Sequence, residues 1–426
     1  MGILKNFYFE KIDTYFLVLF FLSFLHPFLG LVFYAALLYY WLCGTEGYLK
    51  ALIFLTTRGI MNPAIAMQTY FPAFRWIILL GSTSLILIDA KLKGANKTKY
   101  NKVFLITLYF FIIVSVFGWF TSSYPVTSTF KLISFTLTFL AVIKGIAATE
   151  HIFKLKEFFV GFYTVLFIVS ALMIPFPYFR VINADFQGVF NHVNILGIIG
   201  AIYLAAFLTS EWFKKHIYFR NIVGMGVFIM VYLSASRTGM ISAILILLVY
   251  LITNNRLFTW KKIGIILSVI LALFLSEQFS MTIDNSINEF LYKNNAESIW
   301  SSREEIVISY KQKYETSPLL GTGFMVPYEK NVRDYSLYFD LKVEPGNMIW
   351  ALLGDIGIIG TILFWGIVLV ILLNGRIKRL HMLLGAYVVC MGEMVFFSVN
   401  NMSILLYLLI GAYMFDHEGV DEGGIQ

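Results

Sequence analysis

The chain has 426 residues, of which 59% are hydrophobic and 13% are charged, and its formal net charge is +7. Soluble domains have roughly 45–50% apolar and about 25% charged residues. The apolar residues form runs of about twenty, the length that crosses a bilayer as a helix, so the composition excludes a soluble protein and predicts an integral membrane protein. The two cysteines, Cys43 and Cys390, both lie in apolar runs and provide neither a disulfide framework nor a Cys-based metal site.

The first apolar run covers residues 15–43 and contains His26-Pro27, so it forms either one kinked helix or two short ones. A mixed stretch follows at 44–70, with Arg58 in the segment TTRGIMNP (56–63). The sequence then predicts spans at about 71–89, 103–120, 128–147, 158–176, 189–209, 219–235, 237–252, 262–276, 347–373, 381–398 and 400–416.

Basic residues in the connecting segments test this layout. They gather in five places: Lys91, Lys93, Lys97, Lys99 and Lys102; Lys154 and Lys156; Lys214, Lys215 and Arg220; Arg256, Lys261 and Lys262; Arg376, Lys378 and Arg379. All five groups fall on one side of the predicted spans, and positive segments stay in the cytoplasm. We therefore predict about twelve spans with both termini cytoplasmic, or fourteen if the first run is counted differently. The net positive charge reflects this topology and not a nucleic-acid partner.

One long polar segment, residues 277–346, interrupts the apolar chain. It holds 7 Lys/Arg and 11 Asp/Glu, a net charge of −4, while the remainder has 25 against 14, a net charge of +11. A connection of roughly seventy residues is too long for a mere linker. We predict an extracytoplasmic, partly helical subdomain at 277–346, between an N-terminal transmembrane bundle (1–276) and C-terminal transmembrane helices (347–416), with a cytoplasmic tail at 417–426.

Few polar residues fall at the predicted outer boundary. Arg237 lies in SASRTG (234–239), which joins two spans with almost no loop; an arginine there could bind a phosphate through two parallel hydrogen bonds, or extend from a helix end toward water. Asn191, His192 and Asn194 open another span on the same side and could bind sugar hydroxyls, or one asparagine could cap the helix. Arg180 is a further candidate, although a solvated loop arginine is the commoner case.

The polar segment supplies other candidates. Arg303 lies at helical spacing with Trp300 and Tyr310, so it should face the protein or the membrane, where it would bind an anion or a loop carboxylate. Glu344 precedes a span in EPGN (344–347) and is a possible general base or a solvated turn residue. Asp355 lies inside the next span among glycines and needs a polar neighbour.

Several motifs are missing from the sequence. It has no Gly-x4-Gly-Lys-Ser/Thr phosphate loop, no nucleotide-binding glycine motif, no Asp-x-Asp pair and no His, Cys and Asp cluster with metal-ligand spacing. We therefore expect neither a cofactor nor a metal, and no nucleotide-sugar enzyme with a soluble catalytic domain.

Three segments resemble the bacterial O-antigen polymerase and O-antigen ligase superfamily, which includes the Wzy-like polymerases. They are FQGVFNHVNILG (186–197), SASRTG (234–239) before an apolar helix, and the long polar segment with PLLGTG (318–323), Asn347 and GDIGIIG (354–360). The resemblance implies an all-α, polytopic fold similar to the GT-C class of membrane glycosyltransferases. It also implies a metal-independent transfer of glycan from a polyprenyl-pyrophosphate carrier on the outer face of the bacterial cytoplasmic membrane.

The resemblance assigns roles to the candidate residues. Arg237 and Arg303 would hold the pyrophosphate and stabilise it as the leaving group, with Glu344 as the third candidate catalytic residue. The candidate substrate-binding residues are Arg58, Arg180, Asn191, His192, Asn194 and Asn347. The chain departs from the ligases at Gly346-Asn347, where they have a His-Asn pair; this departure favours a polymerase and leaves the base unassigned.

Three alternatives stay open at this point: an O-antigen ligase, a lipid-linked glycan flippase or transporter, and a non-catalytic assembly partner. Transporters usually carry internal repeats and charged or broken helices at mid-membrane, and the sequence has no repeat. The expected partners are a lipid-linked oligosaccharide, the bilayer, a flippase and a chain-length regulator. The sugar and the use of the polymer, as O-antigen, capsule or exopolysaccharide, are left open by the sequence.

Overall fold

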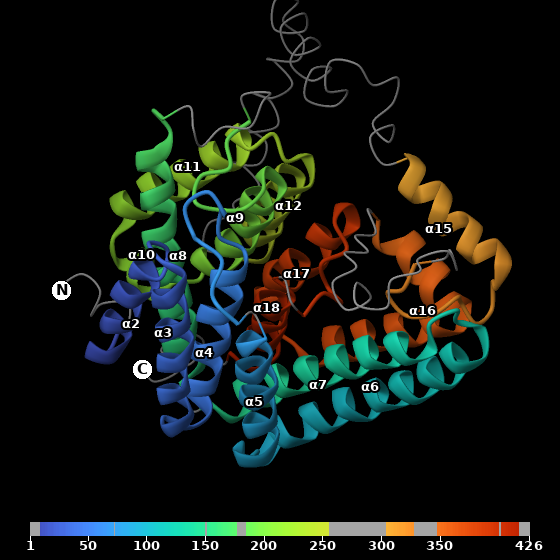
Figure 1. Cartoon of the computed structure of the whole chain (residues 1–426). Coiled ribbons are helices and arrows are strands. Elements are labelled where there is room, and N and C mark those ends of the chain that lie inside the picture. The colour runs from blue at the N-terminus through green and yellow to red at the C-terminus, as the bar shows by residue number, and fades with distance from the viewer. Residues whose placement is uncertain are drawn as a thin grey trace, which may run out of the picture.

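In the computed structural model the described residues are 9–71, 73–149, 151–176, 185–254, 304–327, 347–399 and 402–416. These ranges form helices joined by turns and contain no β-strand, only one isolated bridge between Met61 and Phe190 (Figure 1). The all-α prediction is confirmed for this part of the chain. In chain order the elements are α2 (Lys11–Leu22), α3 (Pro27–Leu37), η1 (Leu38–Leu42), α4 (Gly44–Gly59), α5 (Phe74–Asp89), α6 (Gly94–Thr121), α7 (Pro125–Ala148), α8 (Ile152–Met173), α9 (Val193–Phe207), α10 (Glu211–Lys215), α11 (Ile217–Leu233), α12 (Arg237–Thr253), α15 (Glu304–Thr316), α16 (Met348–Asn374), η5 (Ile377–Arg379), α17 (Leu380–Gly392) and α18 (Ser403–Phe415).

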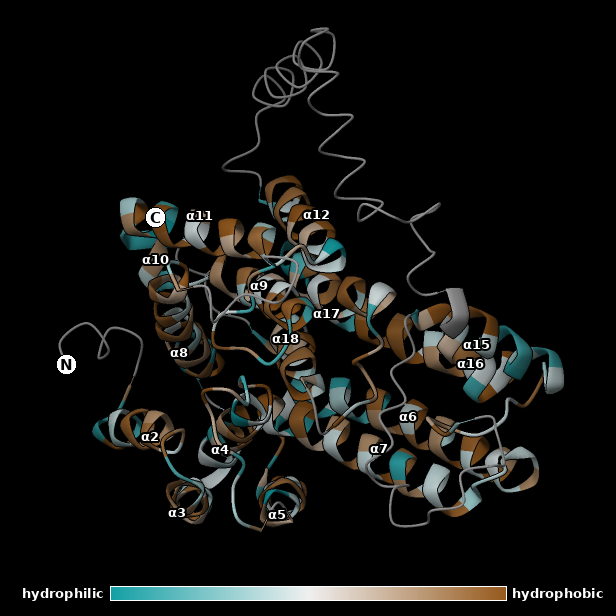
Figure 2. Ribbon diagram, turned by 45° about the horizontal axis from the view of Figure 1, so that its top comes forward, coloured by the Kyte–Doolittle hydropathy of each residue, from teal (hydrophilic) through white to brown (hydrophobic). Residues whose placement is uncertain are grey.

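Four of the described helices are long and apolar enough to cross a membrane: α6, α7, α8 and α16. Shorter apolar helices accompany them at 27–42 and at α9, α11, α12 and α18. Apolar residues cover most helices, and polar residues gather on α15 (Figure 2). Large apolar side chains also lie on the outside, for example Leu105 at 63% and Ile362 at 65% exposure. Water-soluble monomers rarely expose such surfaces, so these helices indicate a membrane protein.

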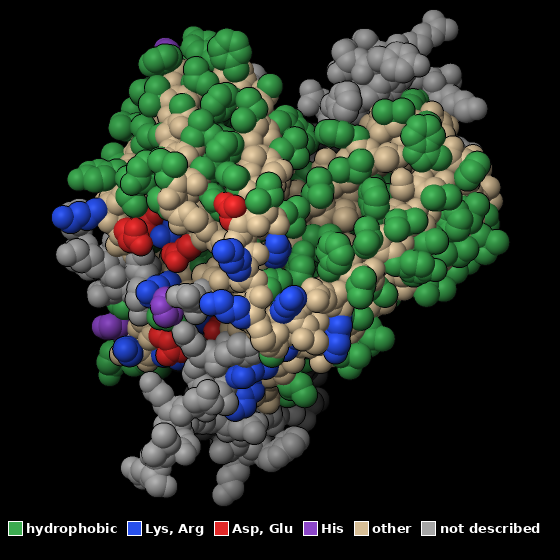
Figure 3. Space-filling view, turned by 90° about the horizontal axis from the view of Figure 1, so that it is seen from below, with side chains coloured by type: hydrophobic (Ala, Val, Ile, Leu, Met, Phe, Trp, Pro, Cys, Tyr) green, Lys and Arg blue, Asp and Glu red, His purple; other side chains and the backbone are tan. Residues whose placement is uncertain are grey.

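Charged side chains occupy a restricted part of the surface. On the face seen in Figure 3, Lys and Arg side chains gather in one band with Asp and Glu among them, and apolar side chains cover much of the surface around that band. This distribution fits a protein that meets water at its ends and lipid along its flanks.

The first apolar run forms two short helices, one of the two alternatives that its sequence allows. Residues 23–26 separate α2 from α3, and Pro27 occupies the first position of α3, where its missing N–H has no cost. His26 caps this helix, because its Nδ1 accepts a hydrogen bond from the backbone N of Phe28 at 3.1 Å. The mixed stretch that follows begins with α4, which is buried along nearly its whole length.

Other predicted spans differ from the structure or lie outside it. The span predicted at 381–398 is helical only to Gly392, because the backbone becomes extended at Glu393 and turns follow. The predicted span at 262–276 lies outside the described residues. The polar segment 277–346 is described only at 304–327, where the predicted helical part is α15. Its extracytoplasmic position and the span count stay predictions.

The core is built around α4, α8 and α9. Phe54 of α4 lies at the centre of a ring cluster that also contains Phe16, Phe20, Phe33, Tyr40, Phe158 and Phe162. Helix α9 is buried on nearly all sides and packs against α11, α12 and α17. These four helices lie side by side in both ribbon views (Figures 1 and 2). The position of α9 among them decides where its N-terminal residues lie.

Helix α16 is interrupted where the 318–323 segment meets it. Gly357 has a φ of 64°, which side-chain-bearing residues rarely adopt, and the helix is broken there. The backbone of 318–323 pairs with this break: Thr322 and Gly323 donate to the carbonyls of Gly354 and Asp355, and Ile358 donates to Pro318. The glycines of GDIGIIG therefore form the place where PLLGTG docks on α16.

A buried ion pair fastens the same junction, which gives Asp355 the polar neighbour that its sequence position demands. Lys313 of α15 lies 2.7 Å from the Asp355 carboxylate and also donates to the carbonyl of Val326 at 2.6 Å. From α7, Lys131 donates to the carbonyl of Met325 at 2.7 Å. Burial, with the Asp355 charge nearby, holds the pKa of Tyr310 well above its usual value. Helix α15 is thus anchored to α16 (Figure 1).

Candidate functional site

The N-termini of α9 and α12 meet at one end of the bundle. A Cβ atom added to Gly239 would lie 2.5 Å from the carbonyl carbon of Gly197, and one added to Gly197 would lie 2.3 Å from Cβ of Ser236. Only glycine permits this approach, so the glycines that close the FQGVFNHVNILG and SASRTG motifs bring the two helix starts together. We call the surrounding residues, 191–194, 236–239 and 392–393, the Arg237 end of the bundle.

Helix α12 begins directly after a three-residue connection from α11. Ser236 caps it, with its Oγ accepting from the backbone N of Gly239 at 3.2 Å, and Ala235 turns the chain with a φ of 49°. Arg237 is the first residue of the helix, and its side chain is half-buried. The prediction that SASRTG joins two helices with almost no loop is confirmed, and it places a guanidinium group at a helix N-terminus.

Helix α9 begins with the three predicted polar residues. The cap is His192 and not an asparagine: its Nδ1 accepts from the backbone N of Asn194 at 3.1 Å, and its ring is exposed. Asn191 donates its backbone N to the carbonyl of Ile60 at 2.9 Å, next to the isolated bridge. Its side-chain Oδ1 is buried and, within the described ranges, accepts no hydrogen bond. A buried acceptor of this kind would be stabilised by any donor that reaches it.

The C-terminal end of α17 completes the group. A Cβ atom on Gly392 would lie 1.9 Å from Oγ1 of Thr238, so α17 ends in close contact with the first turn of α12. The next residue, Glu393, is half-buried and accepts a hydrogen bond from Nδ2 of Asn194 at 2.7 Å. Sequence reasoning missed this carboxylate. The signal that could have found it is a glutamate within a predicted apolar span, where an ionisable side chain is costly.

The arrangement suits a negatively charged ligand bearing hydroxyl groups. Two helix N-termini, capped by His192 and Ser236, bring their positive dipole ends close together. Helix N-termini can bind phosphates, and an arginine at such a place can bind a phosphate through two parallel hydrogen bonds. The amides of Asn191 and Asn194 add neutral hydrogen-bonding groups beside them. Among the described residues, no group of three His, Cys, Asp or Glu side chains could hold a metal ion.

Two other predicted residues have clear structural contacts. Asn347 caps α16, with Oδ1 accepting from the backbone N of Ile349 at 2.9 Å and of Trp350 at 3.3 Å. Arg58 is buried and donates to Ser23 at 3.0 Å and to the carbonyl of Met67 at 2.7 Å. These contacts hold local structure together, and a substrate-binding role for either residue stays a prediction.

The remaining candidates, Arg180, Arg303 and Glu344, lie outside the described residues. The structure therefore brings together four of the predicted site residues, Arg237, Asn191, His192 and Asn194, and adds Glu393 to them.

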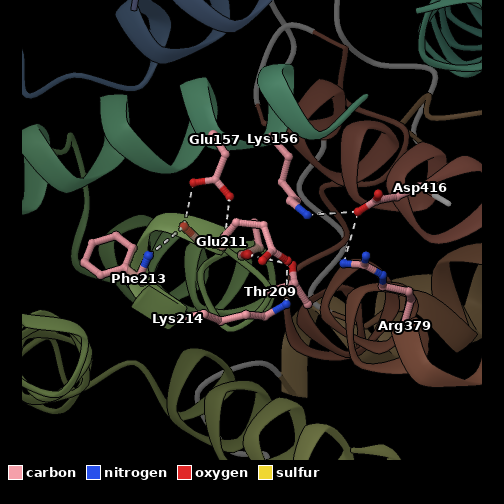
Figure 4. Close-up of polar contacts among 10 residues, drawn as sticks. Lys156, Glu157, Thr209, Glu211, Phe213, Lys214, Arg379 and Asp416 are labelled. Carbon is pink, nitrogen blue, oxygen red and sulfur yellow. Dashed lines mark hydrogen bonds and ion pairs between the residues drawn. The ribbon is translucent and has the colours of Figure 1, made fainter. Parts of the chain in front are cut away.

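A second polar group lies at the other end of α9 and α17. Lys156 and Arg379 both pair with the buried Asp416, with N–O distances of 2.9 and 3.0 Å (Figure 4). The neighbouring Glu157 accepts from Oγ of Ser210 at 2.6 Å and from the backbone N of Glu211 at 2.7 Å. We call the three paired residues the Asp416 cluster. It joins the starts of α8 and α17 to the end of α18.

Comparison with known proteins gives one match. The model of the O-antigen ligase family matches residues 222–365, a range that contains α12, α15 and most of α16. Neither the comparison with curated proteins nor that with solved structures found a match for this chain. The family match confirms the resemblance to the O-antigen polymerase and ligase superfamily, and it supports a function of that type in polysaccharide synthesis.

Proposed function

We propose that the chain is a polysaccharide polymerase. The proposal starts from the match of the O-antigen ligase family model to residues 222–365 and from the apolar helices of the chain. It transfers glycan from a polyprenyl-pyrophosphate carrier to a lipid-linked repeat unit on the outer face of the cytoplasmic membrane. The product is O-antigen, capsule or exopolysaccharide. The observation that carries this proposal is the convergence of two helix N-termini and Arg237 at one end of the bundle.

The chemistry needs a site for a leaving group that gains negative charge. When the bond between the sugar and the pyrophosphate breaks, charge develops on the leaving oxygen, and fixed donors aimed at that charge lower the barrier. The first turns of α9 and α12 and the Arg237 guanidinium are donors of this kind. We place the pyrophosphate there, with Arg303 as a second cation from the polar segment.

The glycan has its own partners at this end. In this scheme a hydroxyl that reaches the buried Oδ1 of Asn191 would donate to it, and the amide of Asn194 lies in the first turn of α9. Neither group is charged, so both discriminate hydroxyl positions without competing for the pyrophosphate. A nucleotide has no role in this scheme because the carrier itself brings the activated sugar.

The polymerase is preferred to the ligase for one sequence reason. At Gly346-Asn347 the chain lacks the histidine of the His-Asn pair that ligases of this superfamily have. Asn347 remains and caps α16. A ligase is the second candidate function, because the matching family model is that of O-antigen ligases.

The test uses purified protein and a short polyprenyl-pyrophosphate oligosaccharide from the native host, with products separated by length. A polymerase yields a ladder of longer lipid-linked chains from this substrate alone. A ligase leaves that substrate unchanged until a lipid A core acceptor is added, and then transfers the chain once. A ladder that forms only with the core acceptor present would overturn the polymerase proposal.

A further inference from the structure

Glu393 is the one carboxylate that the described residues bring to the Arg237 end. It follows the last residue of α17, and Gly392 presses that helix end against Thr238 of α12. The amide of Asn194 donates to its Oε1 at 2.7 Å, which fixes the carboxylate relative to the start of α9. An ionised carboxylate can accept more than one hydrogen bond, so the contact with Asn194 orients the group and is compatible with a second partner such as a hydroxyl.

The other polar side chains described at this end are poor bases. Amides such as Asn191 and Asn194 do not accept protons near neutral pH. His192 uses its Nδ1 lone pair to accept from the backbone N of Asn194, so in the neutral ring the hydrogen lies on Nε2. The Nδ1 lone pair is therefore occupied by the cap of α9. Arg237 is always charged and can only donate.

We propose that Glu393 is the general base that takes the proton from the acceptor sugar hydroxyl. This inference rests on the proposed glycan transfer and names the base that the sequence left unassigned. The acceptor O–H bond breaks and its proton moves to the Glu393 carboxylate, while the oxygen forms a bond to the anomeric carbon of the donor. The bond from that carbon to the pyrophosphate oxygen breaks, and its electron pair leaves with the polyprenyl pyrophosphate. Glu393 then returns the proton to water.

The position of Glu393 suits this division of labour. Arg237 and the helix N-termini hold the leaving group, and the carboxylate enters from a third helix, α17. A base on a separate helix can face the acceptor while the donor phosphates contact α9 and α12. The Asn194 amide acts as a positioning group, because it contacts the base and not the proton.

The test compares Glu393→Gln with the parent protein in the chain-extension assay. Glutamine keeps an oxygen that can accept from Asn194, so the packing of α17 is preserved while the capacity to accept a proton is lost. We expect the rate at saturating donor to fall by about 100-fold or more, the usual contribution of a positioned base. Inhibition by sugar-free polyprenyl pyrophosphate should stay within about threefold of the parent, because that probe tests only the anion site.

A matched control is Glu211→Gln, which changes an exposed carboxylate paired with Lys214 at 2.6 Å near the opposite end of α9 and should leave the rate unchanged. If Glu393→Gln is poorly folded, Glu393→Asp tests the same claim. Aspartate keeps a carboxylate that can accept the proton, so we expect this variant to retain part of the chain-extension rate. A Glu393→Gln protein that extends chains within about threefold of the parent rate would overturn the inference while leaving the polymerase proposal intact. A parent protein that extends no chains would remove both.

Discussion

The two ends of α9 and α17 carry polar groups of opposite kinds. At the Asp416 cluster the buried carboxylate pairs with two buried cations, Lys156 and Arg379, and helices surround these charges (Figure 4). At the Arg237 end the side chains of Arg237, His192 and Glu393 are half-buried or exposed, and they lie beside two helix starts. The same helices are therefore fastened by buried ion pairs at one end and carry partly exposed polar side chains at the other.

From this difference we expect structural charges at the Asp416 cluster and functional ones at the Arg237 end. A buried ion pair offsets the large free-energy cost of desolvating its charges only if its geometry is good. Removal of one partner leaves the other charge buried and uncompensated. The Asp416 cluster has that geometry, and so does the Lys313–Asp355 pair that holds α15 to α16. Substitutions there should change stability, whereas substitutions at the Arg237 end should change turnover.

The largest effect is expected for Arg237→Ala. Removal of one charged donor from a transition-state site costs about 100- to 1,000-fold in rate, so long polymer should disappear while the protein still inserts and accumulates. The measurement is the length distribution of polymer in cells together with protein abundance in membranes. Lys215→Ala, which removes an exposed cation on α10, is the control and should leave the polymer unchanged. Long-chain polymer in the Arg237→Ala strain would remove this residue from the site.

At the opposite end, Asp416→Asn should lower the free energy of unfolding by about 3–5 kcal/mol, because Lys156 and Arg379 keep their charges without a counter-ion. Thermal unfolding of the purified protein in detergent measures this change. The rate per folded molecule should equal that of the parent. A lower rate at full stability would place a functional group in the Asp416 cluster and weaken the distinction between the two ends.

Gly239→Ala should disturb the meeting of α9 and α12. The added methyl group would overlap the backbone of Gly197, and overpacking of this kind costs about 1–3 kcal/mol. We expect reduced stability and a reduced rate together, because the helix starts must separate. Gly226→Ala is the matched control: this helical glycine of α11 has nothing within 4 Å of an added Cβ. Equal behaviour of the two variants would show that the close approach has no role.

The smallest effect is expected for Asn347→Ala. This change removes the cap of α16, and the loss of a cap costs about 1 kcal/mol of stability. If capping is its main role, the chain-extension rate per folded molecule should change by less than about threefold. A loss of about 100-fold at nearly unchanged stability would instead establish the substrate-binding role predicted from the sequence.

The sequence predicted the parts of the fold that depend on one segment at a time. Runs of about twenty apolar residues locate α6, α7, α8 and α16, because a membrane helix leaves a long continuous signal. The short connection before Arg237 was also predictable, since SASRTG leaves no room for a loop. The end of α17 at Gly392 was not, because apolar residues continue beyond Glu393 and hide the break.

Long-range contacts account for what the sequence did not reveal. A charged side chain inside a membrane helix is costly, so the sequence predicted that Asp355 needs a polar partner. That partner, Lys313, is 42 residues away in the chain and could not be identified without the fold. Asn194 and Glu393 are separated by 199 residues, and nothing local to either indicates the other. The convergence of α9 and α12 depends on two glycines whose contact is visible only in three dimensions.

The most direct test incubates the purified parent and Arg237→Ala proteins with a short polyprenyl-pyrophosphate oligosaccharide and resolves the products by length. We expect a ladder of lengthening chains with the parent protein and none with Arg237→Ala. Substrate that stays unchanged in length but moves across a liposome bilayer would contradict this expectation, because the protein would then be a transporter of the lipid-linked glycan.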